Sequence, residues 1–321
     1  MMVRHLLLGI ALIMLANTVS AQNYPSRPIR LVIPYPPGGG TDTVARLLNP
    51  AAIEQLGVQI VIDNRGGANA IIGTDIGAKA SPDGYTMLFC LQASMVVNPI
   101  LYKKIPYNPK RDFTPVIHLD TVALMLAVHP SVPAATVSEL IKLAKDKPGQ
   151  INFSSSGHGS AAHLAVELMN SMAKVKMVHV PFKGGGPAVR AVIAGQVHLS
   201  MGTMISELPH VKAGRLKAIA VSTRNRITSL PDVPTIGETL SGYEAGVWHG
   251  IVVPKGTPAA VVRRLNQAFN NVLKMPEIQS KLRNNGVEPV GGTPEQFASL
   301  IKADEIKHVN LLREVGLVGS L

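Results

Sequence analysis

One local pattern occurs twice in this chain and restricts the folds open to it. Residues 32–40 read VIPYPPGGG and residues 178–186 read VHVPFKGGG. Each begins as a β-branched run, passes through a proline and an aromatic residue to a triple-glycine turn, and continues into helix-forming residues. A strand, a tight turn and a helix make up the first half of a βαβ unit. The repeated pattern therefore predicts two lobes of similar α/β construction.

The rest of the chain alternates in the same way between short apolar runs and helix-forming stretches. Helix starts are marked at Thr136 and Thr293, because Glu139 and Gln296 complete capping boxes with them. Strands are predicted at residues 29–34, 58–62, 86–91, 124–128, 176–180, 216–221 and 248–253. Strands separated by helices require crossover connections, so the predicted fold class is α/β with mainly parallel sheets.

Composition argues against several classes of protein. The net charge is +11, yet the basic residues form no run and aromatic residues are 4% of the chain, which is unlike a nucleic-acid binder. The charge is compatible with an anionic small ligand. Cys90 is the only cysteine, so no internal disulfide can form. Its apolar neighbours predict a small buried side chain.

The first residues carry the marks of export. Arg4 precedes an apolar run at residues 6–16 that is too short for a transmembrane helix, and residues 19–21 (VSA) resemble a signal-peptidase site. We expect cleavage after Ala21, which assigns residues 1–21 to a signal peptide and the mature protein to the periplasm. An uncleaved membrane anchor is the alternative. The residue directly after the cleavage site is Gln22 rather than a cysteine that could carry a lipid.

The glycine turns also predict a kind of binding site. The first N–H groups of a helix lack partners and carry partial positive charge, and glycine lets a ligand approach the backbone. A third turn, residues 152–160 (NFSSSGHGS), adds hydroxyls at Ser155, Ser156 and Ser160, and His163 falls in the helical turn that follows. Together the turns predict an anion site. The alternative is that glycine serves these tight turns for steric reasons alone.

Motifs of common enzymes and metal sites are missing from the sequence. No Gly-Lys-Ser/Thr follows either triple glycine, G-x-G-x-x-G is absent from the turns, and Ser160 lacks the G-x-S-x-G frame. The histidines include His158 and His163 but no H-E-x-x-H. We therefore expect no catalytic residue, metal or cofactor. Asp42 is interpreted as a helix N-cap rather than a general base.

Several segments taken together resemble one family. The sequence resembles the Bug-type extracytoplasmic solute receptors, the binding components of tripartite tricarboxylate transporters. The matching motifs, in family order, are PIRLVIPYPPGGGTD (28–42), NRGG (64–67), SPDGYT (81–86), NPILY (98–102), SGHGSAAHLA (156–165), HVPFKG (179–184), LPDVPT (230–235) and GGTPEQ (291–296). They extend over nearly the whole chain.

The resemblance implies a two-lobed periplasmic-binding-protein fold, type II-like, with a ligand cleft between the lobes. It implies a first lobe of residues 22–123 and 247–321, a second lobe of residues 124–246, and crossings near 124–128 and 244–250. One ligand carboxylate is expected against both lobes, partly through bridging waters. The residues implied for ligand binding are Pro37, Gly38, Gly39, Gly40, Thr41, Asp42, Gln92, Ser94, Ser156, Gly157, Ser160, His163, Lys183, Gly184, Gly202 and Trp248.

The sequence departs from the family pattern where the ligand is expected. Gln92 is longer than the small polar residues common at that position, and His198 and Gly202 stand where many members have acids. Without those acids a ligand ammonium group would lack a counter-charge. A dicarboxylate or an aromatic carboxylate is therefore the expected ligand.

Three roles remain open on the sequence alone. The resemblance favours a monomeric receptor that delivers a small carboxylate, unchanged, to transporter membrane subunits. A periplasmic sensor component, reporting carboxylate occupancy to a membrane kinase, would use the same fold. A periplasmic hydrolase with Ser160 as nucleophile and His163 as base is the enzymatic alternative.

Overall fold

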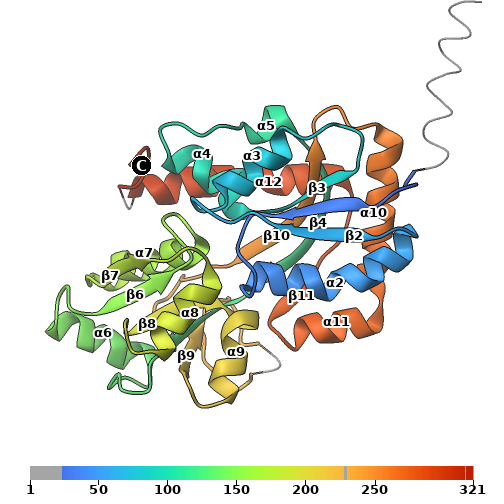
Figure 1. Cartoon of the computed structure of the whole chain (residues 1–321). Helices are drawn as coiled ribbons and strands as arrows, with labels where there is room; N and C mark the ends of the chain where they lie inside the picture. The colour runs from blue at the N-terminus through green and yellow to red at the C-terminus, as the bar shows by residue number, and fades with distance from the viewer. Residues whose placement is uncertain (1–23, 228–229, 315, 321) are drawn as a thin grey trace, which may run out of the picture.

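Two β-sheets, each covered by helices on both faces, form two lobes that lie one above the other in Figure 1. The computed structural model describes residues 24–227, 230–314 and 316–320. A strand covered on both faces needs apolar side chains in both directions. Strand β5 (Leu124–Val128) reads LMLAV and is buried at every position, so it suits the interior of such a sheet.

The upper lobe contains a six-stranded sheet. Leu31 and Ile33 pack on one face of this sheet and Val32 on the other, as the alternation of side chains along a strand requires. In spatial order the strands are β11 (Val287–Pro289), β4 (Phe113–Val122), β10 (Val247–Pro254), β3 (Thr86–Leu91), β1 (Ile29–Ile33) and β2 (Ile60–Asn64). The helices of this lobe are α2 (Gly40–Leu56), α3 (Ile71–Ala78), α4 (Asn98–Leu101), α5 (Pro109–Asp112), α10 (Ala259–Lys274), α11 (Pro276–Arg283) and α12 (Pro294–Glu314), with a π-helical turn at Ala93–Val97.

The lower lobe contains a five-stranded sheet. Met125 and Ala127 of β5 pack towards α8 and α9, whereas Leu126 packs towards α6 and α7. In spatial order the strands are β7 (Val178–Pro181), β6 (Asn152–Ser155), β8 (Leu199–Thr203), β5 and β9 (Lys217–Val221). The helices are α6 (Val137–Asp146), α7 (Ala161–Ala173), α8 (Gly185–Ile193) and α9 (Met204–Lys212), and a single 3₁₀ turn follows at Ile236–Glu238.

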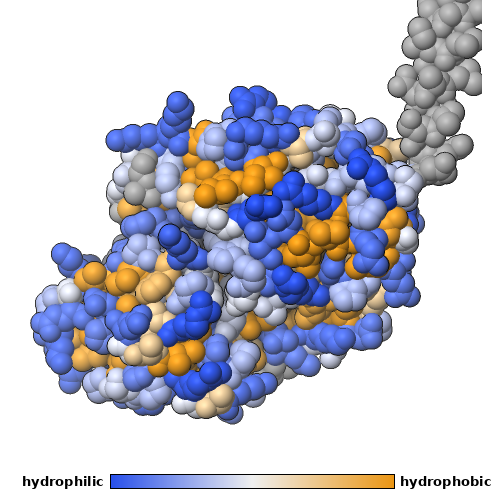
Figure 2. Space-filling model, in the orientation of Figure 1, coloured by the Kyte–Doolittle hydropathy of each residue, from blue (hydrophilic) through white to orange (hydrophobic). Residues whose placement is uncertain are grey.

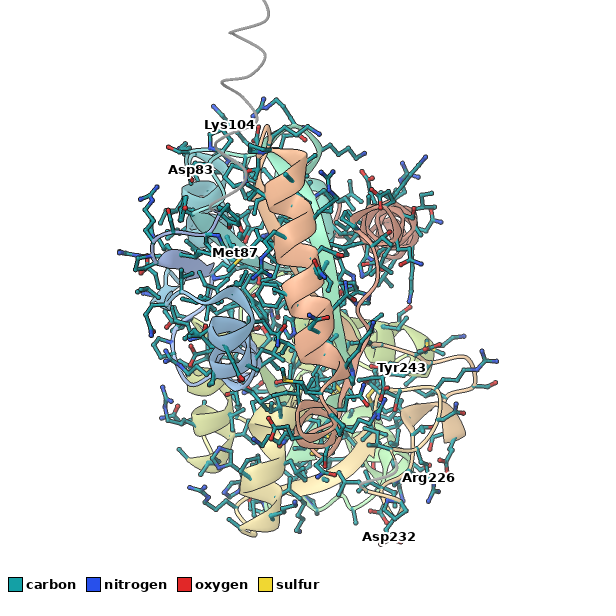
Figure 3. All side chains as sticks on the ribbon, turned by 90° about the vertical axis from the view of Figure 1, so that its right-hand side faces the viewer. Asp83, Met87, Lys104, Arg226, Asp232 and Tyr243 are labelled. Atoms are coloured by element: carbon teal, nitrogen blue, oxygen red, sulfur yellow. The ribbon has the colours of Figure 1, made fainter. Side chains whose placement is uncertain are left out.

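The chain passes between the sheets at two places. Strand β4 continues through Ala123 directly into β5, and the chain returns after β9 to enter β10. Tyr243 lies on the return segment, and its hydroxyl donates to the carbonyl of Ala165 at 2.8 Å. Figure 3 shows α10 along the side of the upper lobe, Asp83 and Lys104 at its far end, Arg226 and Asp232 at the opposite end, and Tyr243 between them. The first and last elements of the described chain, β1 and α12, both belong to the upper lobe.

The crossings also explain the direction of the strands. The pairs β1–β2, β1–β3, β6–β7 and β6–β8 are parallel, as the strand–helix alternation predicts. Every antiparallel pair includes β4, β5 or β10, the strands that carry the chain across. Such strands enter the other sheet without a helical crossover and so need not run parallel to their neighbours. The predicted two-lobed α/β class is confirmed, but the sheets are mixed rather than mainly parallel as predicted.

Each strand predicted from the sequence is present, with ends that differ by at most two residues. Strand β4 was not predicted, because Pro115, His118 and Asp120 interrupt its apolar pattern. Strand β8 was also missed, since its sequence, LSMGT, combines a serine and a glycine that lower strand propensity.

The helix starts and the cysteine follow the predictions, with one exception. Thr136 caps α6 by accepting from the N–H of Glu139, and Thr293 forms reciprocal bonds with Gln296. Cys90 is fully buried, and burial raises the pKa of its thiol. The prediction for Asp42 is wrong: Gly39 occupies the N-cap of α2, and Asp42 lies inside its first turn.

The expected signal peptide and its cleavage site lie outside the described residues. Among the helices of the described part of the chain, none combines the length and the apolar character that crossing a membrane requires.

Candidate ligand cavity between the lobes

A cavity of about 70 Å³ lies where the two lobes meet. The upper lobe contributes the turn after β1, the end of β3 and the start of β10, and the lower lobe contributes β6, β8 and the helices that follow them. Figure 2 shows this face of the molecule indented between the lobes, with hydrophilic and neutral residues along the line of contact. The cavity is therefore walled by segments far apart in the sequence.

Four helices begin at this cavity. Its lining includes Gly40 at the start of α2, Ala161 at the start of α7, Gly185 at the start of α8 and Thr203, the N-cap of α9. Each N-terminus carries about half a unit of positive charge and free N–H groups. The three glycine turns found in the sequence thus meet at one place, and α9 adds a fourth N-terminus that the sequence pattern did not predict.

The two triple-glycine turns pack against each other across the cleft. A Cβ atom added to Gly186 would lie 3.2 Å from the carbonyl oxygen of Gly38, and one added to Gly184 would lie 2.8 Å from Cγ of Pro36. At Gly40 a Cβ atom would overlap Oγ1 of Thr203 and lie 3.1 Å from Cγ2 of Ile205, both in the lower lobe. The glycines therefore allow the backbones of the two lobes to approach closely, which is the steric role considered as the alternative above. The helices that follow them also begin at the cavity.

Hydroxyl groups supply most of the polar lining. Ser155 Oγ donates to the carbonyl of Gly157 and accepts from its N–H, which closes the turn after β6. Gly157 itself has φ of +136°, a conformation that favours glycine. No lysine or arginine is among the lining residues that the structure describes. The hydroxyl-bearing lining residues other than tyrosine are Thr41, Ser154, Ser155, Ser156, Ser200, Thr203 and Ser206.

A buried acid, Glu207, also lines the cavity. Its Oε1 accepts from the hydroxyl of Ser200 and, at 3.1 Å, from the N–H of Gly202. Burial raises the pKa of Glu207 to about 8, against the lowering effect of these two bonds. The argument from the sequence that acids are lost at His198 and Gly202 therefore did not account for this acid of α9. Position 202 has no side chain, but the first turns of α9 bring the carboxyl of Glu207 to the same place.

A histidine–aspartate pair stands on the opposite wall. His249 Nδ1 lies 2.8 Å from Asp120 Oδ1, and its Nε2 lies 3.3 Å from Thr41 Oγ1. Both His249 and Asp120 are buried. The two ring nitrogens of His249 therefore bridge Asp120 and Thr41. The pair thus anchors Thr41 at the cavity wall, although these residues lie far apart in sequence.

Five of the residues implied by the family resemblance line this cavity: Gly39, Gly40, Thr41, Ser156 and Gly202. A separate hollow of about 210 Å³ beside it is lined by Ser156, Gly157, Lys183 and Gly184, together with residues that include Tyr35 and Asn69. Pro37 and Gly38 are exposed at the outer side of the first glycine turn.

Asp42 does not present its carboxylate to the cavity. Its Oδ2 accepts from the N–H of Gly38 at 3.0 Å and from Arg46 at 2.9 Å, and its Oδ1 accepts from Asn64 at 2.9 Å. Although burial opposes them, these bonds lower the pKa of Asp42. The carboxylate is thus occupied in holding the glycine turn on the start of α2.

Three other implied residues belong to the interior of the upper lobe. Gln92 Nε2 and Trp248 Nε1 each donate to Asp304 Oδ2 at 2.9 Å, on the face of the sheet covered by α12. Ser94 donates to the carbonyl of Leu91 at 2.9 Å. Strand β10 does reach the cavity, but through Val247 and His249. Alternation along the strand directs Trp248 to the other side.

Ser160 and His163 are engaged within their own turn. Ser160 Oγ accepts from the backbone N–H of His163 at 3.3 Å as the N-cap of α7. The ring Nδ1 of His163 accepts from the N–H of Gly159 at 3.0 Å, which places the ring proton on Nε2. This arrangement is not a nucleophile paired with a general base, since the hydroxyl and the ring share no hydrogen bond among the described contacts.

His163 also belongs to a cluster with His158 and His179, whose ring nitrogens lie within 4.8 Å of one another. Burial lowers the pKa of His163 to about 4 and that of His179 to about 3, so both rings are neutral. These two rings stack with centroids 3.8 Å apart and planes 18° apart. A metal lies in the plane of each imidazole that binds it, so two stacked rings cannot share one ion in this arrangement.

Known proteins share this sequence pattern. A family model described as tripartite tricarboxylate transporter family receptor matches residues 44–317. A UPF0065 protein of Pseudomonas sp. strain P51 is 38% identical over 319 residues, which cover 98% of this chain and 95% of the relative. BugT of Bordetella pertussis is 36% identical over 307 residues, which cover 94% of this chain and 93% of the relative.

Solved structures share the fold. The periplasmic binding protein BugD superposes with a TM-score of 0.88 at 32% identity, covering 92% of this chain and 99% of BugD. An R. palustris protein solved with adipate has a TM-score of 0.90 at 34% identity, covering 92% and 99%. MatC from Rhodopseudomonas palustris, solved with bound malate, has a TM-score of 0.85 at 30% identity, covering 90% and 100%.

Proposed function

The chain belongs to the tripartite tricarboxylate transporter receptor family, and we propose that its own cargo is a small carboxylate held between the two lobes. The family is one of periplasmic solute-binding receptors, so the role is capture for transport rather than catalysis. We favour transport over sensing because the matching family is defined by a transporter.

The four helix N-termini at one cavity are the observation that carries this proposal. Aligned peptide dipoles and free N–H groups favour a negative charge at each of them. The hydroxyls of the lining add neutral donors. A cavity with these donors suits an anion with several oxygen acceptors, such as a carboxylate.

The related structures favour an aliphatic ligand over an aromatic one. Tyr35 lines the cavity, but its hydroxyl donates to Asn69 at 2.7 Å. Relatives were solved with malate and with adipate, so we expect an aliphatic dicarboxylate here as well.

We place the ligand against both lobes and expect them to close around it. The first lobe comprises residues 22–123 and 247–321, and the second comprises residues 124–246. The ligand contacts are proposed to come from Gly39, Gly40 and Thr41 on one side and from Ser156 and the β8–α9 segment on the other. We further propose signal cleavage after Ala21 and delivery of the ligand, by the monomer, to transporter membrane subunits.

A thermal-shift screen of the mature protein with malate, adipate, benzoate and aspartate tests the proposal. A ligand at a hundred times its Kd raises the free energy of unfolding by about 2.7 kcal/mol. We expect malate or adipate to raise the melting temperature and to be recovered unchanged after incubation. If none of these carboxylates shifts the melting temperature or gives heat by calorimetry, the proposal is refuted.

A further inference from the structure

Glu207, which lines the ligand cavity, has one carboxyl oxygen without a hydrogen-bond partner among the described atoms. The residue is fully buried on α9, and Oε1 accepts both of the hydrogen bonds that the protein provides. Oε2 is buried too and has no hydrogen-bond partner among the described atoms. A Cβ atom at Gly202 would overlap Oε1, so a glycine at that position is what leaves room for the carboxyl.

The environment of the carboxyl favours its neutral form. An ionised carboxylate buried without a cation is strongly disfavoured, and the described lining residues include no lysine or arginine. Burial accordingly raises the pKa of Glu207 to about 8. Because Oε1 already accepts two hydrogen bonds, the proton of the neutral carboxyl belongs on Oε2. The neutral group therefore carries an O–H donor that has no acceptor among the described atoms, on a residue that lines the cavity.

We propose that Glu207 binds the ligand in its protonated form, its Oε2–H donating a hydrogen bond to an oxygen of the ligand carboxylate. This inference rests on the proposed function and names the residue that makes carboxylate binding depend on a proton. It also gives the ligand a chemical requirement: an acceptor oxygen, rather than an ammonium group, faces α9.

Other ionisable groups around Glu207 do not account for its behaviour. Strands β5 and β8, which pack against α9, carry none. On α2 the acid Asp42 is paired with Arg46. Arg190 of α8 and His210 of α9 line a separate hollow next to Ser206, and Lys212 is in the last turn of α9. None of these groups is a cause of the raised pKa of Glu207. The groups concerned are Tyr35 and His249 in the cavity wall, Asp42 and Arg46 on α2, and Arg190, His210 and Arg215 at the separate hollow.

The sign of the pH dependence follows from this arrangement. A bound carboxylate stabilises the neutral form of Glu207, whose pKa is about 8 in the free protein, and in this proposal only the neutral form binds, so the complex stays protonated throughout the pH range tested. Affinity is then level below pH 7 and falls as pH rises through 8, because the protonated fraction of free protein decreases. Between pH 7 and pH 9 that fraction, and with it the affinity, falls about tenfold.

The experiment is a calorimetric titration of the mature protein with malate, repeated with adipate, at pH 7, 8 and 9. At pH 9 the titration is run in two buffers of different ionisation enthalpy. The difference in measured heat gives the number of protons that the complex takes up or releases on binding. We expect uptake of about 0.9 proton per ligand at pH 9 and an affinity about tenfold below that at pH 7. Glu207→Gln keeps a donor toward the ligand and an acceptor for Ser200, so its affinity should be level over this range with no proton uptake. Glu167→Gln, outside the cavity, is the matched control and should behave as the wild type.

The outcomes separate this inference from the function on which it rests. Binding with level affinity and no proton uptake in the wild type would overturn the role of Glu207 and leave the receptor function standing. Proton release, or preference for an amino-acid ligand that is lost in Glu207→Gln, would mean that the ionised carboxylate binds an ammonium group. Absence of binding by malate and by adipate would overturn the role of Glu207 proposed here, and absence of binding by all four carboxylates of the thermal-shift screen would refute the receptor function as well. The proton count needs only the wild-type protein, so the test holds even if a variant fails to fold.

Discussion

Replacing Gly40 with alanine should weaken ligand binding by blocking closure of the lobes. The added Cβ atom would overlap Oγ1 of Thr203 and lie 3.1 Å from Cγ2 of Ile205. All of its nearest neighbours are in the lower lobe, so the clash exists only when the lobes are together. Within α2 the change is favourable, since alanine exceeds glycine in helix propensity by up to about 1 kcal/mol.

The size of the effect follows from the cost of overpacking. Forcing an extra methyl group into a packed contact costs about 1–3 kcal/mol, and here only the closed state bears that cost. Affinity for malate should therefore fall between about 5-fold and about 150-fold. The melting temperature of the ligand-free protein should change little. Calorimetry measures the first quantity and thermal unfolding the second.

Two further measurements tie the effect to the contact between lobes. Small-angle scattering should show the radius of gyration of the wild type decreasing with saturating ligand, and that of Gly40→Ala decreasing less. Thr203→Ala removes the closest atom, so the double variant should bind better than the sum of the single effects predicts. Wild-type affinity in Gly40→Ala, or a large loss of ligand-free stability, would refute the reasoning.

Three other predictions follow from the same structure. Intact-mass analysis of exported protein should find Gln22 at the N-terminus, and retention of residues 1–21 would contradict cleavage after Ala21. Ser160→Ala should lower the free energy of unfolding by about 1 kcal/mol through loss of the α7 cap while leaving affinity near that of the wild type. A tenfold loss of affinity would instead indicate that Ser160 contacts the ligand. Burial raises the pKa of Asp304, but bonds from His308, Trp248 and Gln92 outweigh it and lower the pKa. The ionised Asp304 therefore stabilises the fold at pH values above its ordinary pKa, and this stabilisation is lost as the pH falls through its pKa in the folded protein. In Asp304→Asn the free energy of unfolding, measured between pH 6 and pH 3, should fall less steeply with decreasing pH than in the wild type.

Prediction from sequence worked best where a feature depends on neighbouring residues. The triple-glycine turns, the capping boxes at Thr136 and Thr293 and the apolar strands are local patterns, and each forms the element predicted for it. The fold class then follows from the order of those elements. Strand β4 was not predicted, because its pairing with β10 and β11, rather than its own sequence, makes it a strand.

The composition of the cavity was predictable only in part. Gly39, Gly40, Thr41, Ser156 and Gly202 line it as the family resemblance implied. Glu207 and His249 were missed, since no short motif surrounds either residue and each reaches the cavity through its position in the fold. Gln92 and Trp248 do not line this cavity, because both side chains donate to Asp304 inside the upper lobe.

The sequence by itself determined that this chain has two α/β lobes and several helix N-termini preceded by glycine turns. Only the tertiary structure decided that four of those N-termini meet at one cavity, and that Glu207 and His249 stand among them. Backbone propensity, capping and periodicity act over a few residues, so they are readable in the chain. Contacts such as that of Thr41 with His249 join segments 208 residues apart, and their geometry depends on how two sheets pack against each other.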